Sequence, residues 1–285
     1  MKEIINHEFG GERPLYKSED LHLTDVTIHP GESSVKECRN IHADRCRFEG
    51  KYVFWENDGV VCRDCVFAES ARSSVWYSRN ITYCNCQVDA PKMFRRATGI
   101  DLENVQIPHG EETFWDCSSI RLRNVQIAEA DYLFMHSCDI DIQDYRQDGN
   151  YSFQYARNVV IHNAVINSKD SFWESQYCTL YDCEINGEYL GWYSKSLRLV
   201  RCHITGTQPL CYCENLILED CTFGDDADLA FEYSTVEATV RSHIVSIKNP
   251  TSGHITVESA GEVIIDNNMK QPGDCEITIL NNEKP

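Results

Sequence analysis

The stretch Ile120-Arg121-Leu122-Arg123-Asn124-Val125-Gln126-Ile127 carries apolar residues at its first, third, sixth and eighth positions, and this pattern recurs along most of the chain. Ten further copies lie between Leu21 and Phe223, each 19 to 21 residues from the next. A fixed period of this length is the signature of a solenoid, in which each repeat is one coil. The copies are Leu21/Leu23/Val26/Ile28, Ile41/Ala43/Cys46/Phe48, Val60/Cys62/Cys65/Phe67, Ile81/Tyr83/Cys86/Val88, Ile100/Leu102/Val105/Ile107, Ile140/Ile142/Tyr145, Val159/Ile161/Ala164/Ile166, Cys178/Leu180/Cys183/Ile185, Leu197/Leu199/Cys202/Ile204 and Leu216/Leu218/Cys221/Phe223.

Each copy of the pattern predicts two short strands separated by a corner. Positions one and three alternate as on a strand with one buried face, and so do positions six and eight. The residue before position six is Asn or Asp in all copies except those with Arg45 and Arg201. Asn and Asp tolerate the left-handed backbone that a sharp corner needs. We therefore expect a vertical stack of corner residues: Asp25, Asp64, Asn85, Asn104, Asn124, Asp144, Asn163, Asp182 and Asp220.

A third strand is expected six residues before each pattern. Its leading residue is apolar in most coils, the residue three further on is small, and both are expected to point inward. The leading column is Phe54, Val75, Phe94, Phe114, Phe134, Phe153, Phe172, Gly191 and Leu210, and the small column is Asn57, Ser78, Ala97, Cys117, Ser137, Ala156, Ser175, Ser194 and Cys213. Three strands in a coil of 19 to 21 residues predict an all-β fold, a single-stranded right-handed parallel β-helix of about 11 coils.

Two other solenoid folds are alternatives to the right-handed parallel β-helix. A left-handed hexapeptide helix needs a six-residue apolar period and frequent glycine, and the sequence has neither. A pentapeptide-repeat helix is closer, because apolar residues at positions one, three, six and eight fit two successive pentads. The five-residue rhythm fails in the other half of each coil, so this fold remains the alternative.

We expect a single domain spanning residues 1–285. Residues 1–19 precede the first pattern and are expected to form an amino-terminal cap, because a solenoid must cover its terminal core. Residues 20–223 are the regular coils. After Phe223 the period breaks, and turn signals such as Asn249-Pro250 predict irregular last coils and a carboxy-terminal cap over residues 224–285.

The 15 cysteines, with Cys62-x-x-Cys65 among their spacings, first suggest a disulfide scaffold or a metal site. Six of them occupy position six of the pattern, where a free cysteine packs as a small hydrophobe. We therefore expect reduced structural cysteines, no metal site and no cofactor. The six are Cys46, Cys65, Cys86, Cys183, Cys202 and Cys221.

Charge and hydropathy exclude several classes of partner. The net charge is −19 and no Lys/Arg cluster is present, so we expect no nucleic-acid binding. No apolar run reaches the roughly 18 residues that span a bilayer, and the first residues lack the apolar segment of a signal peptide. We therefore expect a cytoplasmic protein without a membrane contact.

A family resemblance accompanies these patterns. The segment Phe9-Gly10-Gly11-Glu12-Arg13-Pro14-Leu15-Tyr16, followed by coils rich in Phe-Trp-Glu, Asn-Val-x-Ile and Asp-Cys-x-Ile phrases, resembles an uncharacterised bacterial family of right-handed β-helix proteins of the pectate-lyase-like superfamily. The resemblance covers nearly the whole chain. It implies the fold and supplies no catalytic residues, because the superfamily's fold hosts lyases, hydrolases and non-enzymatic adhesins.

Two columns between the leading and small residues are expected to face solvent, and together they form the outer stripe. All five tryptophans of the chain lie in the first column. Indole faces with charged and phenolic neighbours suit a sugar ring, which offers apolar C–H faces and directional hydroxyls. The sequence therefore predicts binding of an oligo- or polysaccharide, with the following ligand-binding residues: Trp55, Glu56, Trp76, Tyr77, Trp115, Tyr155, Trp173, Glu174, Trp192 and Tyr193.

Whether the protein is an enzyme stays open at this point. A lyase needs a base and cations that stabilise developing negative charge. Arg95, Arg96 and His136 are suitable residue types, and Asp116 could orient the histidine. The calcium-binding Asp clusters of pectate lyases and the motifs of polygalacturonases are not recognisable.

Other functions fit the same residues. The stripe could be a structural ladder in which stacked aromatics and alternating charges stabilise neighbouring coils, or it could be a protein–protein surface. From a different class, an acidic solenoid could mimic DNA and occupy a basic DNA-binding cleft. Mimicry would show binding that collapses with salt, whereas a saccharide groove would show little salt dependence.

Overall fold

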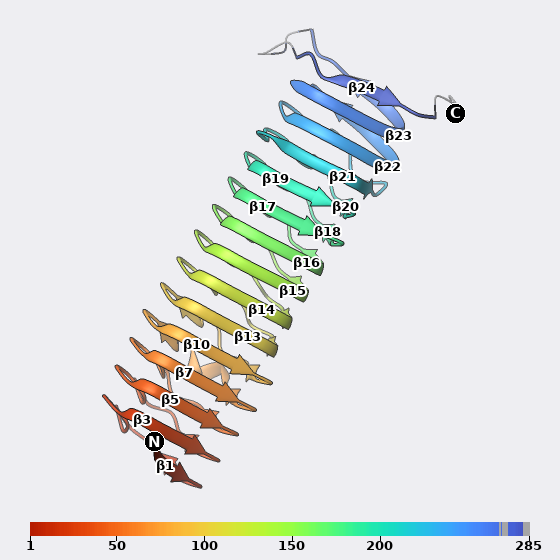
Figure 1. The fold of residues 1–285 in the computed structure, drawn as a ribbon. Coiled ribbons are helices and arrows are strands. Elements are labelled where there is room, and N and C mark those ends of the chain that lie inside the picture. Colours follow the sequence, from red (N-terminus) through yellow and green to blue (C-terminus); the bar gives the residue numbers. More distant parts are fainter. Residues whose placement is uncertain (268, 270–272, 282–285) are drawn as a thin grey trace. The chain divides into compact units, whose positions relative to one another are not determined.

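The computed structural model describes residues 1–267, 269 and 273–281, and in them the chain is almost entirely β-structure. The chain forms two compact units, residues 1–148 and residues 149–285. Within each unit, parallel strands of successive coils lie side by side (Figure 1). In the described part of the chain, no helix is long and apolar enough to cross a membrane.

The first unit contains sixteen elements, in which a longer strand and a short strand alternate in most coils. They are β1 (Lys2–Ile5), β2 (Glu8–Phe9), β3 (Glu19–Thr24), β4 (Thr27–Ile28), β5 (Arg39–Asp44), β6 (Arg47–Phe48), β7 (Asp58–Arg63), β8 (Val66–Phe67), η1 (Glu69–Ala71), β9 (Val75–Trp76), β10 (Arg79–Cys84), β11 (Gln87–Val88), β12 (Phe94–Arg95), β13 (Thr98–Ile107), β14 (Ser118–Ile127) and β15 (Cys138–Asp148).

The second unit continues the same alternation and ends in longer strands. Its described elements are β16 (Arg157–Asn167), β17 (Gln176–Tyr181), β18 (Glu184–Asn186), β19 (Lys195–Val200), β20 (His203–Thr205), β21 (Leu216–Phe223), β22 (Thr235–Lys248), β23 (Ser252–Ile264) and β24 (Glu276–Ile279). The pairing of β21 with β22 and of β22 with β23 contains register shifts.

Equivalent residues of successive coils pair directly. Ile120 of β14 lies between Ile100 of β13 and Ile140 of β15, and the other apolar positions follow the same register. On the near side of each unit the strands run in one direction, and the chain returns behind them while it advances to the next coil (Figure 1). The winding is therefore right-handed, and the predicted parallel β-solenoid is confirmed.

The solenoid has more turns than the predicted 11. In the described residues, eight strands begin successive coils in the first unit and seven do so in the second. One addition lies in the segment expected to be a cap, because Lys2–Ile5 pairs in register with residues 21–24. Its sequence does not show the pattern, since Lys2 and His7 stand where other coils carry apolar residues.

The third strand was predicted for every coil and forms, among the described residues, at only β9 and β12. The backbone explains the difference. In the later coils of the first unit both the leading residue and the residue two further on are left-handed, for example Phe114 (φ 60°) and Asp116 (φ 53°). Alternating left-handed residues turn the chain and cannot continue a strand.

The core consists of vertical stacks of like residues. Ile120, Leu122, Val125 and Ile127 are all at most 2% exposed. The leading column is equally buried, and its rings stack face to face: the centroids of Phe94 and Phe114 are 4.8 Å apart with an interplanar angle of 2°. Phe153 and Phe172 repeat this arrangement in the second unit at 4.7 Å and 3°. Each coil therefore completes the core of its neighbours.

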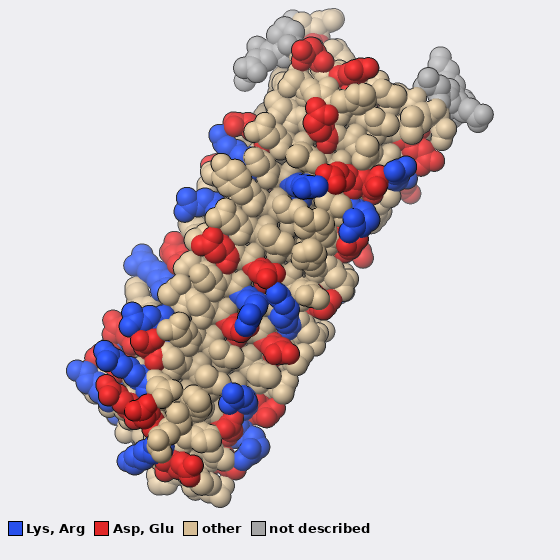
Figure 2. All heavy atoms as spheres, in the orientation of Figure 1, with Lys and Arg blue, Asp and Glu red and all other residues tan. Residues whose placement is uncertain are grey.

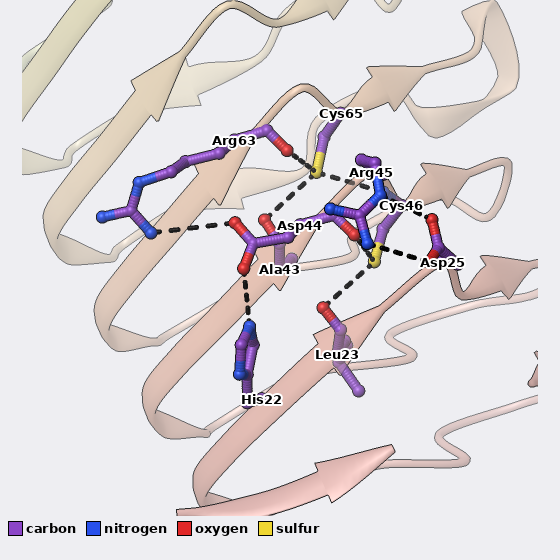
Figure 3. A network of polar contacts seen from close by, with 9 residues as sticks. All are labelled: His22, Leu23, Asp25, Ala43, Asp44, Arg45, Cys46, Arg63 and Cys65. Atoms are coloured by element: carbon purple, nitrogen blue, oxygen red, sulfur yellow. Dashed lines mark hydrogen bonds and ion pairs between the residues drawn. The ribbon is translucent and has the colours of Figure 1, made fainter. Parts of the chain in front are cut away.

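The predicted corner is confirmed in both units. The residues before position six have φ between 52° and 55°, including the two arginines. Their side chains connect successive coils: Asn104 donates to Asn85 at 3.1 Å and accepts from Asn124 at 2.8 Å. Where arginine occupies the corner position, an ion pair connects the two coils. Arg45 donates two hydrogen bonds to the Asp25 carboxylate, at 2.8 and 2.9 Å (Figure 3).

Figure 3 shows how the outer and inner faces of one corner are stabilised separately. On the outer face, the Asp44 carboxylate forms a hydrogen bond with the Nε2 of His22 at 2.6 Å, and its Oδ1 lies 3.7 Å from the Nη1 of Arg63. On the inner face, the thiols of Cys46 and Cys65 donate to backbone carbonyls of the preceding coil, those of Leu23 and Ala43. The cysteines at position six are buried and free, so their predicted structural role is confirmed.

We predict that Asn104→Val lowers the free energy of unfolding by about 1–3 kcal/mol, because a β-branched residue is strained in a left-handed corner. The substitution also removes both hydrogen bonds of the Asn104 side-chain amide. Asn104→Gly removes the same bonds and keeps the backbone conformation, so its loss should be smaller. Urea denaturation of the full chain measures both; equal losses would contradict a conformational requirement at the corner.

We predict that a maleimide labels the native protein only at its partly exposed cysteines, Cys84, Cys138 and Cys275. Even there the reaction should be slow where the thiolate is disfavoured: burial raises the pKa of the Cys84 thiol and raises that of Cys275 to about 11. Denatured protein should label at all 15 cysteines. Mass spectrometry identifies the sites, and rapid native labelling of Cys46 would contradict the buried column.

Candidate functional site

The outer stripe of the first unit divides into a half-buried column and an exposed column. The first column contains Trp55, Trp76, Arg95 and Trp115, each partly covered by its neighbours. The second column is exposed and left-handed throughout, with φ between 49° and 59°, so it forms a second corner. Its residues are Glu56, Tyr77, Arg96, Asp116 and His136.

Arg95 is a packed residue between two aromatic rings. Its guanidinium carbon lies 4.5 Å from the Trp76 ring centroid and 4.4 Å from that of Trp115. Glu112 accepts a charged hydrogen bond from Arg95 at 3.1 Å, and the Nε of Arg95 is buried without a partner. These contacts hold Arg95 between the two indole rings.

The indole rings of the first column are also engaged with adjacent coils. Trp76 donates its Nε1–H to the carbonyl of Lys92 at 2.8 Å, and Trp115 donates to the carbonyl of Tyr132. Trp55 stacks on Trp76 with centroids 5.1 Å apart and an interplanar angle of 30°. These contacts are those of a structural ladder, and the ligand-binding roles of the three tryptophans stay predictions.

The other predicted catalytic residues lie on the exposed corner. Arg96 approaches Asp116 with an Nε–Oδ2 distance of 3.8 Å, and its guanidinium carbon lies 5.8 Å from the Tyr77 ring centroid. His136 follows Asp116 on the next coil and is exposed, with φ 57°. The structure therefore brings Arg96 and Asp116 together, and the catalytic roles of all four residues stay predictions.

In the second unit the predicted ligand-binding residues form another aromatic group. Trp173 packs against Trp192 and Tyr193, with centroids 5.5 and 5.6 Å apart. Trp192 donates its Nε1–H to the carbonyl of Gln208 at 2.7 Å, and Tyr193 stacks on Tyr212 at 4.8 Å. Trp173 therefore contacts rings of the following coil on one side.

A hollow of about 400 Å³, here called the aromatic hollow, opens on the other side of Trp173 within the second unit. It lies between two successive coils. Three of its six lining residues, Tyr155, Trp173 and Glu174, are predicted ligand-binding residues. Its lining residues are Tyr151, Gln154, Tyr155, Asp170, Trp173 and Glu174. Burial raises the pKa of the Asp170 carboxyl above its ordinary value.

The largest hollow described here lies in the first unit and is called the corner groove. It has a volume of about 630 Å³ and runs beside the exposed corner of four successive coils. Small residues in the bend form its floor, because they leave room between the corner and the start of each sheet strand. Its lining residues are Lys17, Glu19, Glu37, Cys38, Arg39, Glu56, Asn57, Asp58, Tyr77 and Arg79.

Charged groups of the corner groove are oriented by one another. Arg79 donates to Asp58 at 2.8 Å and holds the pKa of that carboxyl below its ordinary value. The pKa of Glu37 is lowered as well, first by the hydrogen bond from Tyr16 at 3.0 Å. On the floor, Asn57 accepts a bond from the backbone of Cys38 at 2.9 Å, while its Nδ2 is buried without a hydrogen-bond partner.

Sequence reasoning found two residues of this groove, Glu56 and Tyr77, and missed the rest. Four of the missed residues share one place in the sequence: each lies two positions before the first residue of an apolar pattern. In the first four coils with the pattern this residue alternates in charge as Glu19, Arg39, Asp58 and Arg79. These residues begin the sheet strands β3, β5, β7 and β10 and form one rim of the groove.

No cluster of three or more His, Cys, Asp or Glu side chains in the described residues could hold a metal ion. The fold and these two hollows define the class of the protein, a parallel β-solenoid with ligand-sized depressions along its corners. The chain belongs to the family described as "Protein of unknown function (DUF3737)", whose sequence profile matches residues 2–278. Membership of the pectate-lyase-like superfamily stays a prediction.

Comparison with curated proteins found no match. Among solved structures, HetL, a pentapeptide repeat protein from Nostoc sp. strain PCC 7120, is 11% identical and aligns over 78% of this chain and 92% of its own, with a TM-score of 0.28. The plasmid-mediated fluoroquinolone resistance protein QnrB1 is 10% identical over 79% and 93%, with a TM-score of 0.24. The A-module of the Azotobacter vinelandii mannuronan C-5 epimerase AlgE4 is 9% identical over 95% and 88%, with a TM-score of 0.27. Likenesses this distant carry no argument about function.

We predict that Arg95→Met lowers the free energy of unfolding by about 1–3 kcal/mol, because it removes two cation–π contacts and an ion pair from a partly buried ladder. Arg96→Met is the matched control: Arg96 is exposed, and its loss should change stability by no more than about 0.5 kcal/mol. Thermal unfolding and near-ultraviolet circular dichroism of the tryptophans measure both. Identical melting of the two variants would contradict a structural role for Arg95.

Proposed function

We propose that this protein binds an extended saccharide in the corner groove of its first unit. The observation that carries the proposal is a polar groove of about 630 Å³, lined by acidic, basic and amide side chains of four successive coils. These side chains offer hydrogen-bond donors and acceptors along the whole groove. The groove is thus complementary to a hydroxyl-rich ligand.

The length of the groove favours a chain over a single small molecule. Its lining residues come from four successive coils, and coils stacked at a strand spacing of about 4.8 Å place the first and fourth about 14 Å apart. A ligand along this axis meets a new pair of rim residues at each coil. Repeating units can therefore make repeating contacts.

The charges of the groove favour a neutral ligand. Acidic and basic groups alternate along the rim, and two of them form the ion pair Arg79–Asp58 at 2.8 Å. Such pairs offer donors and acceptors side by side, which suits a hydroxyl because it can donate one bond and accept others. Tyr77 is 44% exposed and adds an apolar surface at one end.

The proposal is for binding without turnover. A general acid in glycoside hydrolysis needs a raised pKa, whereas the pKa values of Glu37 and Asp58 are both shifted downward by hydrogen bonds. These two carboxylates are held ionised and act as hydrogen-bond acceptors. Glu37 and Asp58 therefore serve recognition in this proposal.

Mimicry of DNA remains the alternative from a different class. It requires carboxylates that follow one face without interruption, and the face drawn in Figure 2 carries acidic and basic side chains side by side. Ion pairs between neighbouring coils, such as Arg121–Asp101 and Arg123–Asp141, likewise place basic groups beside carboxylates. The salt dependence of binding separates the two functions.

The test is a panel of neutral and acidic oligosaccharides titrated into the full chain by calorimetry. Arg39→Gln should weaken binding of a recognised neutral saccharide about tenfold, since a hydrogen bond to a charged group contributes about 1.5–3 kcal/mol. Arg47→Gln is the matched control, because Arg47 is exposed in the same unit and lies outside the groove.

Binding should change little between low and moderate salt. The proposal fails if no saccharide binds, or if Arg47→Gln weakens binding as much as Arg39→Gln. Binding to a basic DNA-binding protein that collapses with salt would instead support mimicry.

A further inference from the structure

The aromatic hollow of the second unit differs chemically from the corner groove. Three of its six lining residues are aromatic, Tyr151, Tyr155 and Trp173, and two are carboxylates, Asp170 and Glu174. Lys169 is near but does not line it. The hollow therefore combines ring surfaces with negative charge in one concavity.

Two carboxylates line this hollow without an ion pair in the described part of the chain. Several other acidic groups of the second unit are paired with bases, as Asp182 is with Arg201 and Glu232 with Lys248. Within the described residues, neither Asp170 nor Glu174 has a side-chain hydrogen bond or an ion pair to a basic group. Asp170 is half-buried, so its charge is poorly compensated by water.

The aromatic rings are placed to receive a cation. Trp173 packs against Trp192 and Tyr193 of the following coil, and the hollow lies on its opposite side, toward the coil of Tyr151 and Tyr155. The Tyr151 ring already attracts an ammonium group, since the Nζ of Lys169 lies 5.3 Å from its centroid. Ring faces attract cations through the ring quadrupole, and this attraction is strongest where the cation is desolvated.

From these contacts we propose that the aromatic hollow binds an alkylated ammonium cation, such as a trimethylammonium group. A quaternary ammonium is weakly hydrated and has no N–H to donate, so rings and carboxylates that form no ion pair recognise it better than they recognise a hydroxyl-rich ligand. A hollow of about 400 Å³ accommodates such a group. The net charge of −19 attracts cations to the protein in general, and the rings select among them.

This inference is independent of saccharide binding, because the two sites share no residue and lie in different units. The experiment titrates choline into the full chain by calorimetry, and compares it with 3,3-dimethylbutan-1-ol, which has the same shape without the charge. Sodium at matched ionic strength controls for screening. Choline should bind, and neither control should compete with it.

Two variants test the residues. Trp173→Leu, and the shape-preserving pair Asp170→Asn with Glu174→Gln, should each weaken choline binding at least about tenfold. Glu184→Gln is the matched charge control: Glu184 is exposed in the same unit and lies outside the hollow. Lys169→Gln should keep binding or strengthen it, because it removes a competing cation.

The carboxylate pair keeps the test decisive even if Trp173→Leu unfolds, which thermal melting would reveal. The proposal is overturned if choline does not bind, if the neutral alcohol binds equally well, or if the carboxylate pair and Glu184→Gln behave alike. Displacement of choline by a neutral saccharide at the same concentration would also overturn it.

Discussion

The pairing of successive coils in parallel register is the constraint on which the rest of the structure depends. In the regular coils it places side chains directly above their equivalents, at a spacing of about 4.8 Å. Apolar residues satisfy this constraint by stacking, as Phe94 and Phe114 do. Charged residues satisfy it only in opposite pairs, such as Arg201 with Asp182, and amides satisfy it by donating along the column, as Asn104 does to Asn85.

The same register brings the aromatic rings of successive coils into contact. Rings repeated at the coil spacing lie within stacking distance, so Tyr193 and Tyr212 cover each other's faces and Arg95 fills the space between two indoles. The tryptophan column opens at one place in the second unit. Gln154 stands in the tryptophan column one coil before Trp173, and the aromatic hollow lies at that interruption.

The two hollows arise from different features of the coil and carry different chemistry. The corner groove follows the bend in which small residues such as Cys38 and Asn57 leave room beneath charged rims, so it presents paired donors and acceptors. The aromatic hollow presents aromatic rings together with two carboxylates that form no ion pair within the described residues. A solenoid can in this way display distinct ligand sites on one repeated scaffold, because loop and corner residues vary while the core columns stay apolar.

The sequence by itself determined the repeat, the buried columns and the left-handed corner at Asn104 and its equivalents. These follow from local rules: alternation with a period of two, and the tolerance of Asn and Asp for positive φ. It did not determine that the coil containing Lys2 and His7 joins the solenoid, nor that left-handed residues such as Phe114 replace most of the third strand. Only the tertiary structure decided which ring faces are covered and where Arg39, Asp58 and Asp170 line hollows. The physical reason is that the covered rings and the linings of the hollows are formed by residues of neighbouring coils, 16 to 21 residues apart in the chain, and the rotamers that bring them together leave no local pattern in the chain.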